Sequence, residues 1–180
     1  PLVLLCGSNY LPVQRCAALI LGNVAQSDES RQDAGSHGAV EALFLLSETD
    51  DDEVRMNAMW AVSNLAWNAA NQERVGKFLP QLLDLCCHRA SEIVRENSTM
   101  ALANALFYHE GNRRRMGWHV GSLARLVGLT SDTSAKVREH AARALGTAAH
   151  NDENAAQIGE VGGVEALVTL CGGDSGESMH

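Results

Sequence analysis

Three short clusters of polar residues have types and spacings that could support chemistry. Cys86, Cys87 and His88 are soft metal ligands, but no second Cys/His pair stands at the spacing of a zinc site. The acidic run 50–53 directly precedes an apolar helical pattern, where carboxylates suit a helix N-terminus. The arginine run 113–115 has no wider basic patch around it, which is typical of a solvated helix face. We therefore predict no metal and no cofactor.

Catalysis is not indicated by any other pattern in the chain. The sequence contains no phosphate-binding glycine loop, and neither a Ser/His/Asp nor a Cys/His arrangement can be argued from it. We predict that the chain is not an enzyme, has no catalytic residues and takes no small-molecule substrate. The alternative is an enzyme whose catalytic part lies outside this segment.

Composition favours helices and argues against nucleic acid. Apolar residues make up 46% of the 180 residues, aromatic residues 4%, and only three prolines occur. Much Ala and Leu with few β-branched runs favours helix over sheet. The net charge is −8, and acids outnumber bases by 11 to 6 in residues 1–90 and by 11 to 8 in residues 91–180. Nucleic-acid binders usually carry a net basic patch, so we predict no nucleic-acid partner.

The cysteines indicate a reducing environment. Five are present, an odd number, and most stand in apolar surroundings, so we expect reduced and buried thiols in a cytoplasmic protein, with the nucleus as the alternative location. No apolar run approaches the roughly 18–20 residues that a membrane span needs. Because the chain opens with Pro1, membrane contact is expected only through an anchor outside this segment.

Four segments repeat when each is anchored on one valine. The anchors Val13, Val54, Val94 and Val137 lie 41, 40 and 43 residues apart. Four residues after each anchor stands a small residue, and seven and eight residues after it stand apolar ones, which is one stripe of an α-helix. These helices are expected near residues 11–27, 52–68, 91–108 and 134–150.

A second apolar pattern precedes the later anchors and recurs once more near the end of the chain. It begins at residues 39, 78, 122 and 163. Gly38, Gly121 and Gly162 stand just before three of these segments, where a helix must stop and the chain must turn. Lys77 replaces the glycine in the remaining repeat, so that turn is expected to differ.

These residues resemble the armadillo repeat, most closely in VRMNAMWAVSNLAWN (54–68) and GGVEALVTLC (162–171). The resemblance implies an all-α, right-handed α-solenoid of about four armadillo repeats with three helices each, as a segment of a longer array. It places a single domain at residues 1–173 and a flexible tail at 174–180. The related HEAT repeat is the competing family, but its characteristic proline and Asp/Arg positions are not evident.

The resemblance also implies a binding groove, because the third helix of each armadillo repeat lines a concave face. An asparagine ten residues after the anchor is similar to the residue that holds the backbone of an extended peptide, since its amide both donates and accepts. Trp60 and Asn64 form a Trp-x-x-x-Asn pair like that of importin-α grooves. The residues expected to line the groove are Asn57, Trp60, Asn64, Trp67, Asn23, Asn104, Phe107 and Arg143.

These residues also have a purely structural interpretation. The asparagines at this position could tie adjacent third helices together, and Trp60 and Trp67 could belong to the core. The residues of the stripe include no carboxylate, and its charged members are Arg143 and the histidines His140 and His150. We therefore expect an extended or helical partner with apolar anchors and some acidic residues.

The sequence thus predicts a non-enzymatic scaffold or adaptor that binds another protein along its groove. Two alternatives stay open. One is a nuclear-transport cargo receptor of the importin-α type. The other is a structural element of a ciliary or cytoskeletal assembly.

Overall fold

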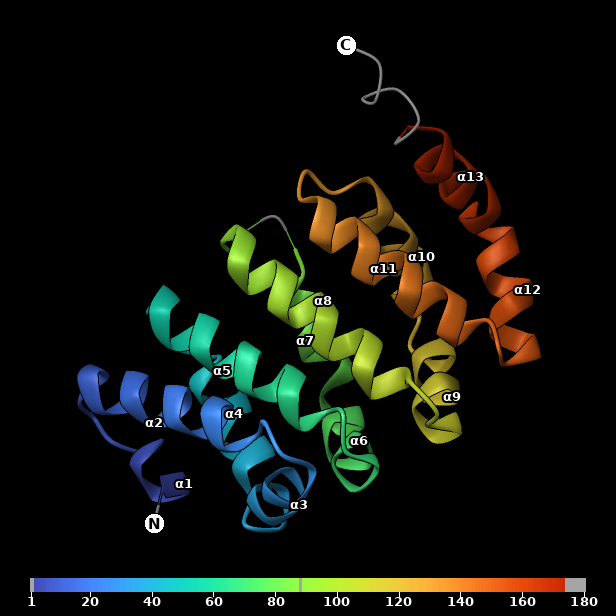
Figure 1. Cartoon of the computed structure of the whole chain (residues 1–180). Helices are drawn as coiled ribbons and strands as arrows, with labels where there is room; N and C mark the ends of the chain where they lie inside the picture. The colour runs from blue at the N-terminus through green and yellow to red at the C-terminus, as the bar shows by residue number, and fades with distance from the viewer. Residues whose placement is uncertain (1, 88, 174–180) are drawn as a thin grey trace.

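The computed structural model describes residues 2–87 and 89–173, which are helices joined by turns and contain no strand (Figure 1). His88 and the expected tail at 174–180 lie outside these residues. The elements repeat in the order first, second and third helix, and the three kinds form separate rows (Figure 1).

Each row consists of equivalent helices. The third helices are α2 (Leu11–Val24), α5 (Asp52–Leu65), α8 (Glu92–Leu106) and α11 (Ala135–Ala148). The first helices are α3 (Asp28–Ser36), α6 (Ala69–Val75), α9 (Glu110–Trp118) and α12 (Asp152–Glu160). The second helices are α1 (Leu2–Leu5), α4 (Ala39–Leu46), α7 (Leu79–Leu85), α10 (Ser122–Gly128) and α13 (Gly163–Gly173).

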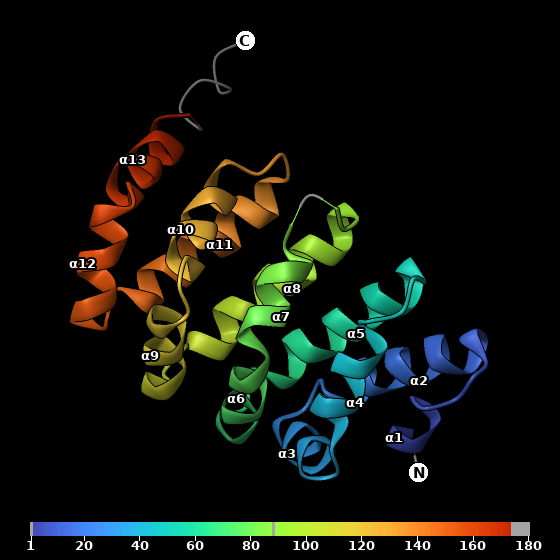
Figure 2. The same cartoon turned by 180° about the vertical axis from the view of Figure 1, so that it is seen from behind.

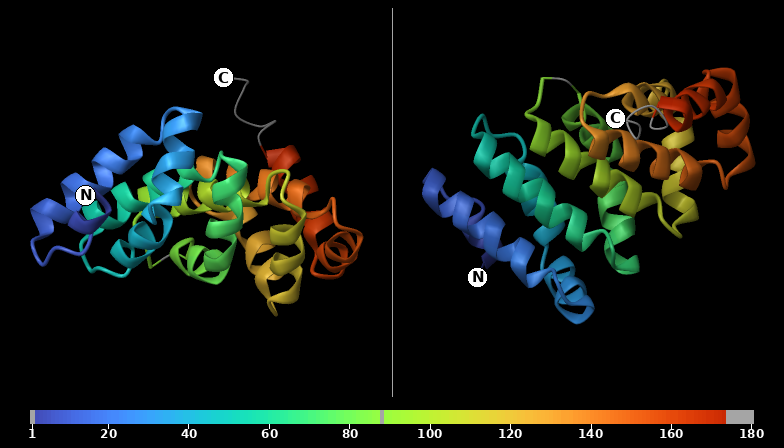
Figure 3. Two further views of the ribbon diagram at one scale, coloured as in Figure 1. Left: turned by 90° about the horizontal axis from the view of Figure 1, so that it is seen from below. Right: turned by 45° about the horizontal axis from the view of Figure 1, so that its top comes forward.

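The third helices lie side by side in one layer, each packed on the next (Figures 1 and 3). The second helices α4, α7 and α10 form a layer behind them, as the reverse view shows (Figure 2). This stacking of similar units confirms the predicted all-α solenoid.

The third helices end two or three residues earlier than the sequence pattern suggests. α2 ends at Val24, because Ser27 already caps the next helix by accepting a hydrogen bond from the backbone N–H of Ser30. Asn68 and Asn151 cap α6 and α12 in the same way. The residues between the third helix and the next first helix therefore form a sharp turn, although their apolar pattern continues that of the helix.

The glycine turns form where they are expected. Gly38, Gly121 and Gly162 have φ angles of +82°, +78° and +81°, a left-handed conformation that costs glycine little. At the repeat without this glycine, Gly76–Phe78 form a 3-10 turn that leads directly into α7. Lys77 thus avoids a positive φ, which explains how that turn differs.

The core follows the repeated stripe with one exception. The small and aliphatic positions of the later third helices are buried, including Ala58, Leu102 and Leu145. Ile20 of α2 belongs to the same stripe but is 41% exposed. The equivalent residues Ala61, Ala101 and Ala144 are buried, and each belongs to a third helix that packs on a preceding one, which α2 lacks within the described residues.

Asparagines on the first helices form a ladder that connects successive repeats. The Nδ2 atom of Asn112 donates to the backbone carbonyl of Gln72 in the preceding first helix and to that of Ala105 in its own repeat, both at 2.7 Å. Asn71 and Asn154 make the equivalent pairs of bonds. All three asparagines are almost fully buried, so each joins three helices at a point without water.

Replacing Asn112 with alanine is predicted to lower the free energy of unfolding by about 1–3 kcal/mol, because two buried carbonyls lose a donor. Urea denaturation followed by circular dichroism measures this. Asn23→Ala is the matched control, because Asn23 is exposed and, among the described residues, its side chain meets only Gln26, at 3.5 Å. It should change stability by less than about 0.5 kcal/mol. Equal losses in the two variants would contradict the role assigned to the ladder.

Candidate functional site

The third helices expose a continuous surface, which we call the third-helix face: the solvent side of α2, α5, α8 and α11 carrying Trp60, Asn64, Trp67 and Phe107. Trp60 is half-buried and lies over the backbone of α2. A Cβ atom at Gly22 would lie 2.3 Å from the Trp60 ring, so only glycine lets the indole settle there. Trp60 is therefore both a packing residue and part of the surface.

The asparagines ten residues after the anchors tie the third helices together. The Nδ2 atom of Asn64 donates to the backbone carbonyl of Gly22 at 3.2 Å, and that of Asn104 to the carbonyl of Ser63 at 2.9 Å. Asn64 remains half-buried, and among the described residues no hydrogen bond to its amide oxygen is found. The structural interpretation thus holds for both residues, and for Asn64 it leaves an acceptor for a ligand.

Asn104 is not available to a partner in this structure. Its side chain is buried, its donor is held by Ser63, and its amide oxygen accepts from the Arg143 guanidinium at 2.9 Å. Asn57 is buried too, whereas Asn23 is exposed beside Gln26. Packing thus occupies the amide of Asn104 and covers Asn57, so of the three asparagines ten residues after the anchors only Asn23 and Asn64 reach the surface in this structure.

An aromatic cluster stands at the C-terminal ends of α5 and α8. Trp67, which is 48% exposed, meets Phe107 edge-on with ring centroids 6.1 Å apart. Phe107 in turn contacts Tyr108, with centroids 4.1 Å apart. Both predicted residues thus lie together on the third-helix face rather than in the core.

Tyr108 is a site residue that the sequence reasoning missed. It is 84% exposed and has a φ of +54°, which is uncommon for a residue other than glycine. The helix cap follows the anchor by 14 residues at Asn68 but by 15 at His109, so Tyr108 is a one-residue insertion in this turn. The anchors Val94 and Val137 lie 43 residues apart, further than the other pairs, and this longer spacing is the sequence signal for the insertion.

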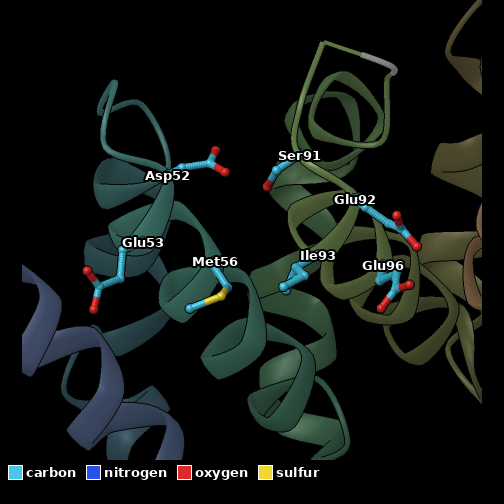
Figure 4. A pocket seen from close by; sticks show the side chains of 7 residues that line it. All are labelled: Asp52, Glu53, Met56, Ser91, Glu92, Ile93 and Glu96. Atoms are coloured by element: carbon cyan, nitrogen blue, oxygen red, sulfur yellow. The ribbon is translucent and has the colours of Figure 1, made fainter.

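Carboxylates gather at the N-terminal ends of α5 and α8, at the end of the third-helix face opposite the aromatic cluster. An open cavity of about 510 Å³ separates the N-terminal ends of α5 and α8 (Figure 4). Its lining residues are Asp52, Glu53, Met56, Ser91, Glu92, Ile93 and Glu96. Met56 and Ile93 lie between Glu53 on one side and Glu92 and Glu96 on the other (Figure 4). The neutral groove expected from the stripe is therefore bordered by acids.

The acidic side chains differ in how far they are engaged. A hydrogen bond from Ser91 lowers the pKa of Asp52, which faces Ser91 across the gap (Figure 4). Glu53 pairs with Arg15 of α2 at 2.8 Å. Among the described residues Glu92 forms no ion pair, so its exposed carboxylate is open to a cation.

A second cavity of about 270 Å³ continues the row between α8 and α11. It is lined by Glu96, Asn97, Met100, Lys136, Glu139 and His140. Glu96 borders both cavities and is held by Ser134 and Lys136. Burial, aided by the charge of Arg143, lowers the pKa of His140. Burial therefore disfavours the positively charged form of this imidazole in the cavity.

Neither a metal site nor a membrane-spanning helix is found in the part of the chain that the structure describes. Among residues 2–87 and 89–173, no group of three or more His, Cys, Asp or Glu side chains could hold a metal ion. In the same part of the chain, no helix is long and apolar enough to cross a membrane. The Arg113–Arg115 run lies on α9, where Arg113 pairs with Glu110 and Arg115 with Glu73.

Solved structures with the same architecture place the chain in a family. A designed armadillo repeat protein, YIII(Dq)4CqI, is 30% identical and superposes with a TM-score of 0.84 over 94% of this chain and 72% of its own. This chain belongs to the armadillo-repeat family. A HEAT-like repeat model matches residues 12–65, and no curated protein sequence matches the chain.

Two further designed armadillo structures are similar to this armadillo-repeat chain. One, described as computationally designed for modular peptide recognition, is 29% identical with a TM-score of 0.85 and covers 94% of this chain and 72% of its own. The other, in complex with the peptide (KR)4, is 28% identical with a TM-score of 0.85 and covers 100% of this chain and 75% of its own.

The reactivity of individual cysteines tests which of them are exposed and which are buried. Burial raises the pKa of Cys6 to about 11 and that of Cys86 to about 12, whereas Cys16 is exposed on α2, against the expectation of buried thiols. Iodoacetamide at pH 8 is therefore predicted to label Cys16 in the native protein and to spare Cys6 and Cys86 until denaturant is added. Peptide mapping by mass spectrometry measures this, and early labelling of Cys86 would contradict the packing of α7.

Proposed function

We propose that this chain is a non-enzymatic scaffold or adaptor that binds an extended segment of another protein across its third-helix face. The observation that carries the proposal is the row of open cavities between α5, α8 and α11, together with the partly exposed rings of Trp67 and Phe107 at the ends of α5 and α8. Aromatic side chains that are anchored on one side and solvent-exposed on the other are typical of binding hot spots. The location proposed is cytoplasmic, with the nucleus as the alternative.

The chemistry of the cavities favours a partner with basic residues. The aliphatic stem of a lysine or arginine can lie on Met56 and Ile93 while its charge reaches Glu92. The similar designed protein in complex with (KR)4 supports such a partner for this fold. The acidic partner expected from the stripe is less favoured, because Arg143 is bonded to Asn104 and the cavities carry carboxylates.

A nuclear-transport cargo receptor is the second candidate, favoured by the same acidic cavities and by the Trp60–Asn64 pair. Its test is whether peptides with basic localisation signals bind more tightly than other basic peptides of equal charge. Equal affinities would leave the general scaffold as the function.

Direct binding tests the proposed function. A fluorescein-labelled peptide of four Lys-Arg pairs is predicted to bind the full chain, measured by fluorescence anisotropy at several salt concentrations, and a peptide of four Asp-Glu pairs is predicted not to. Glu92→Gln with Glu96→Gln should weaken binding roughly tenfold, and Trp67→Ala similarly, because each removes a contact worth about 1.4 kcal/mol.

The matched control is Glu29→Gln with Glu48→Gln, which changes the net charge equally at exposed positions away from the cavities. It should weaken binding less than twofold. Equal losses in the two double variants would show that only the overall charge matters. Equal binding of the basic and acidic peptides would overturn the preference for a basic partner.

A further inference from the structure

The repeat that contains α9 is two residues longer than the first repeat, and both extra residues are exposed. Its valine anchors lie 43 residues apart, against 41 for the first pair, and Tyr108 accounts for one of the two. The other lies between the helix cap and the glycine turn, which are 12 residues apart in this repeat but 11 apart in the repeats of α3 and α12. The sequences SHG (36–38) and WHVG (118–121) align with Val120 as the extra residue, and its side chain is fully exposed.

A tryptophan stands beside this insertion at a position that is polar in the other repeats. Trp118 ends α9 and is 67% exposed, because it faces away from the side of the helix on which Asn112 and Met116 are buried. The residues at the same distance from the equivalent polar position of the other first helices are all exposed: Ser36, Lys77 and Glu160. Packing within the solenoid therefore does not explain the indole.

The Arg114 guanidinium lies over the Trp118 ring, 5.4 Å from its centroid. Arg114 is exposed and, unlike the other two arginines of its run, forms no ion pair among the described residues. The carboxylate of Glu110, one turn earlier, accepts hydrogen bonds from Arg113 and Asn151, which lower its pKa, and the charge of Arg114 adds a smaller effect. The stacked guanidinium therefore keeps N–H groups for an external acceptor.

These residues form a surface separate from the third-helix face. We call it the α9 edge, defined by Arg114, Trp118 and Val120. The row of first helices α3, α6 and α9 lies along the lower border of the solenoid in Figure 1, below the third helices. None of the three residues lines the cavities between α5, α8 and α11.

We propose that the α9 edge binds a short acidic segment of a partner protein in which an aliphatic or aromatic residue stands next to Asp or Glu. The apolar side chain packs on Trp118 and Val120, and the carboxylate pairs with the guanidinium of Arg114. Tryptophan and arginine are the residue types that most often dominate such contacts.

Charge complementarity identifies this occupant. The cation of the α9 edge has no ion-pair partner among the described residues, whereas the cavities of the third-helix face are lined by carboxylates. The two surfaces therefore select segments of opposite charge, and the chain can hold two partners at once. A membrane surface fits less well, because a chain with a net charge of −8 needs more than one free cation to attach to anionic lipid.

Selection from designed peptides tests the proposal. Three libraries of eight-residue peptides are displayed on phage: Asp or Glu mixed with Leu or Phe, Lys or Arg mixed with Leu or Phe, and Asp or Glu mixed with Ser or Gln. The full chain should enrich sequences from the first library and none from the third. Fluorescence anisotropy of the enriched acidic peptides should show about tenfold weaker binding to Trp118→Ser and about fivefold weaker binding to Arg114→Gln.

The variants carry the residue types that α3 has at the same positions, Ser36 and Gln32, so each should keep its Tm within about 2 °C. Leu45→Ser, which removes a 58% exposed apolar side chain from α4, is the matched control and should weaken binding less than about twofold. The peptide of four Lys-Arg pairs should bind Trp118→Ser as it binds the original chain. The α9 edge and the third-helix face can thus fail independently.

Two results would overturn the proposal. One is that the first library gives no enriched sequence, or that its sequences bind Trp118→Ser and the original chain equally. The other is that vesicles of phosphatidylcholine and phosphatidylserine cosediment with the original chain but not with Trp118→Ser, since a lipid surface would then occupy the α9 edge.

Discussion

Short amide side chains that reach from one repeat to the backbone of the repeat before it hold this structure in register. A carbonyl oxygen that is already bonded within its own helix can accept a second hydrogen bond. The asparagine side chain is short, so its amide reaches that oxygen only when the two helices pack closely. Asn64 and Asn104 do this in the layer of third helices, and Asn112 does it among the first helices. Because a solenoid repeat touches only its neighbours, such local contacts set the spacing of the whole array.

This constraint decides what the third-helix face has left for binding. Both polar atoms of the Asn104 amide and the Nδ2 atom of Asn64 are engaged in hydrogen bonds between helices. The other groups that the face offers to a partner are aromatic rings and carboxylates. The rings gather at the C-terminal ends of α5 and α8, and the acids at the N-terminal ends of α5, α8 and α11. The face therefore has an acidic border and an aromatic border on opposite ends of the same helices.

Helix chemistry by itself accounts for the acidic border. Carboxylates in the first turn of a helix interact favourably with its macrodipole, so Asp52 and Glu92 suit their helices whether or not a partner binds. Stacking the helices in parallel brings these residues to the same edge, where their charges add. Exposed rings such as Tyr108, held with a left-handed φ, have no comparable explanation in helix stability.

The sequence by itself determined the architecture, because a 40-residue period with buried residues at helical spacing has few other solutions. The left-handed glycines at 38, 121 and 162 and the different turn at Lys77 were also predictable, since local backbone conformation depends on local residue type. Only the tertiary structure decided the roles of the site residues. Whether an asparagine faces a partner or a neighbouring helix, and whether Glu96 borders the groove, depends on how closely helices forty residues apart approach each other. A pattern read along one helix does not contain that distance.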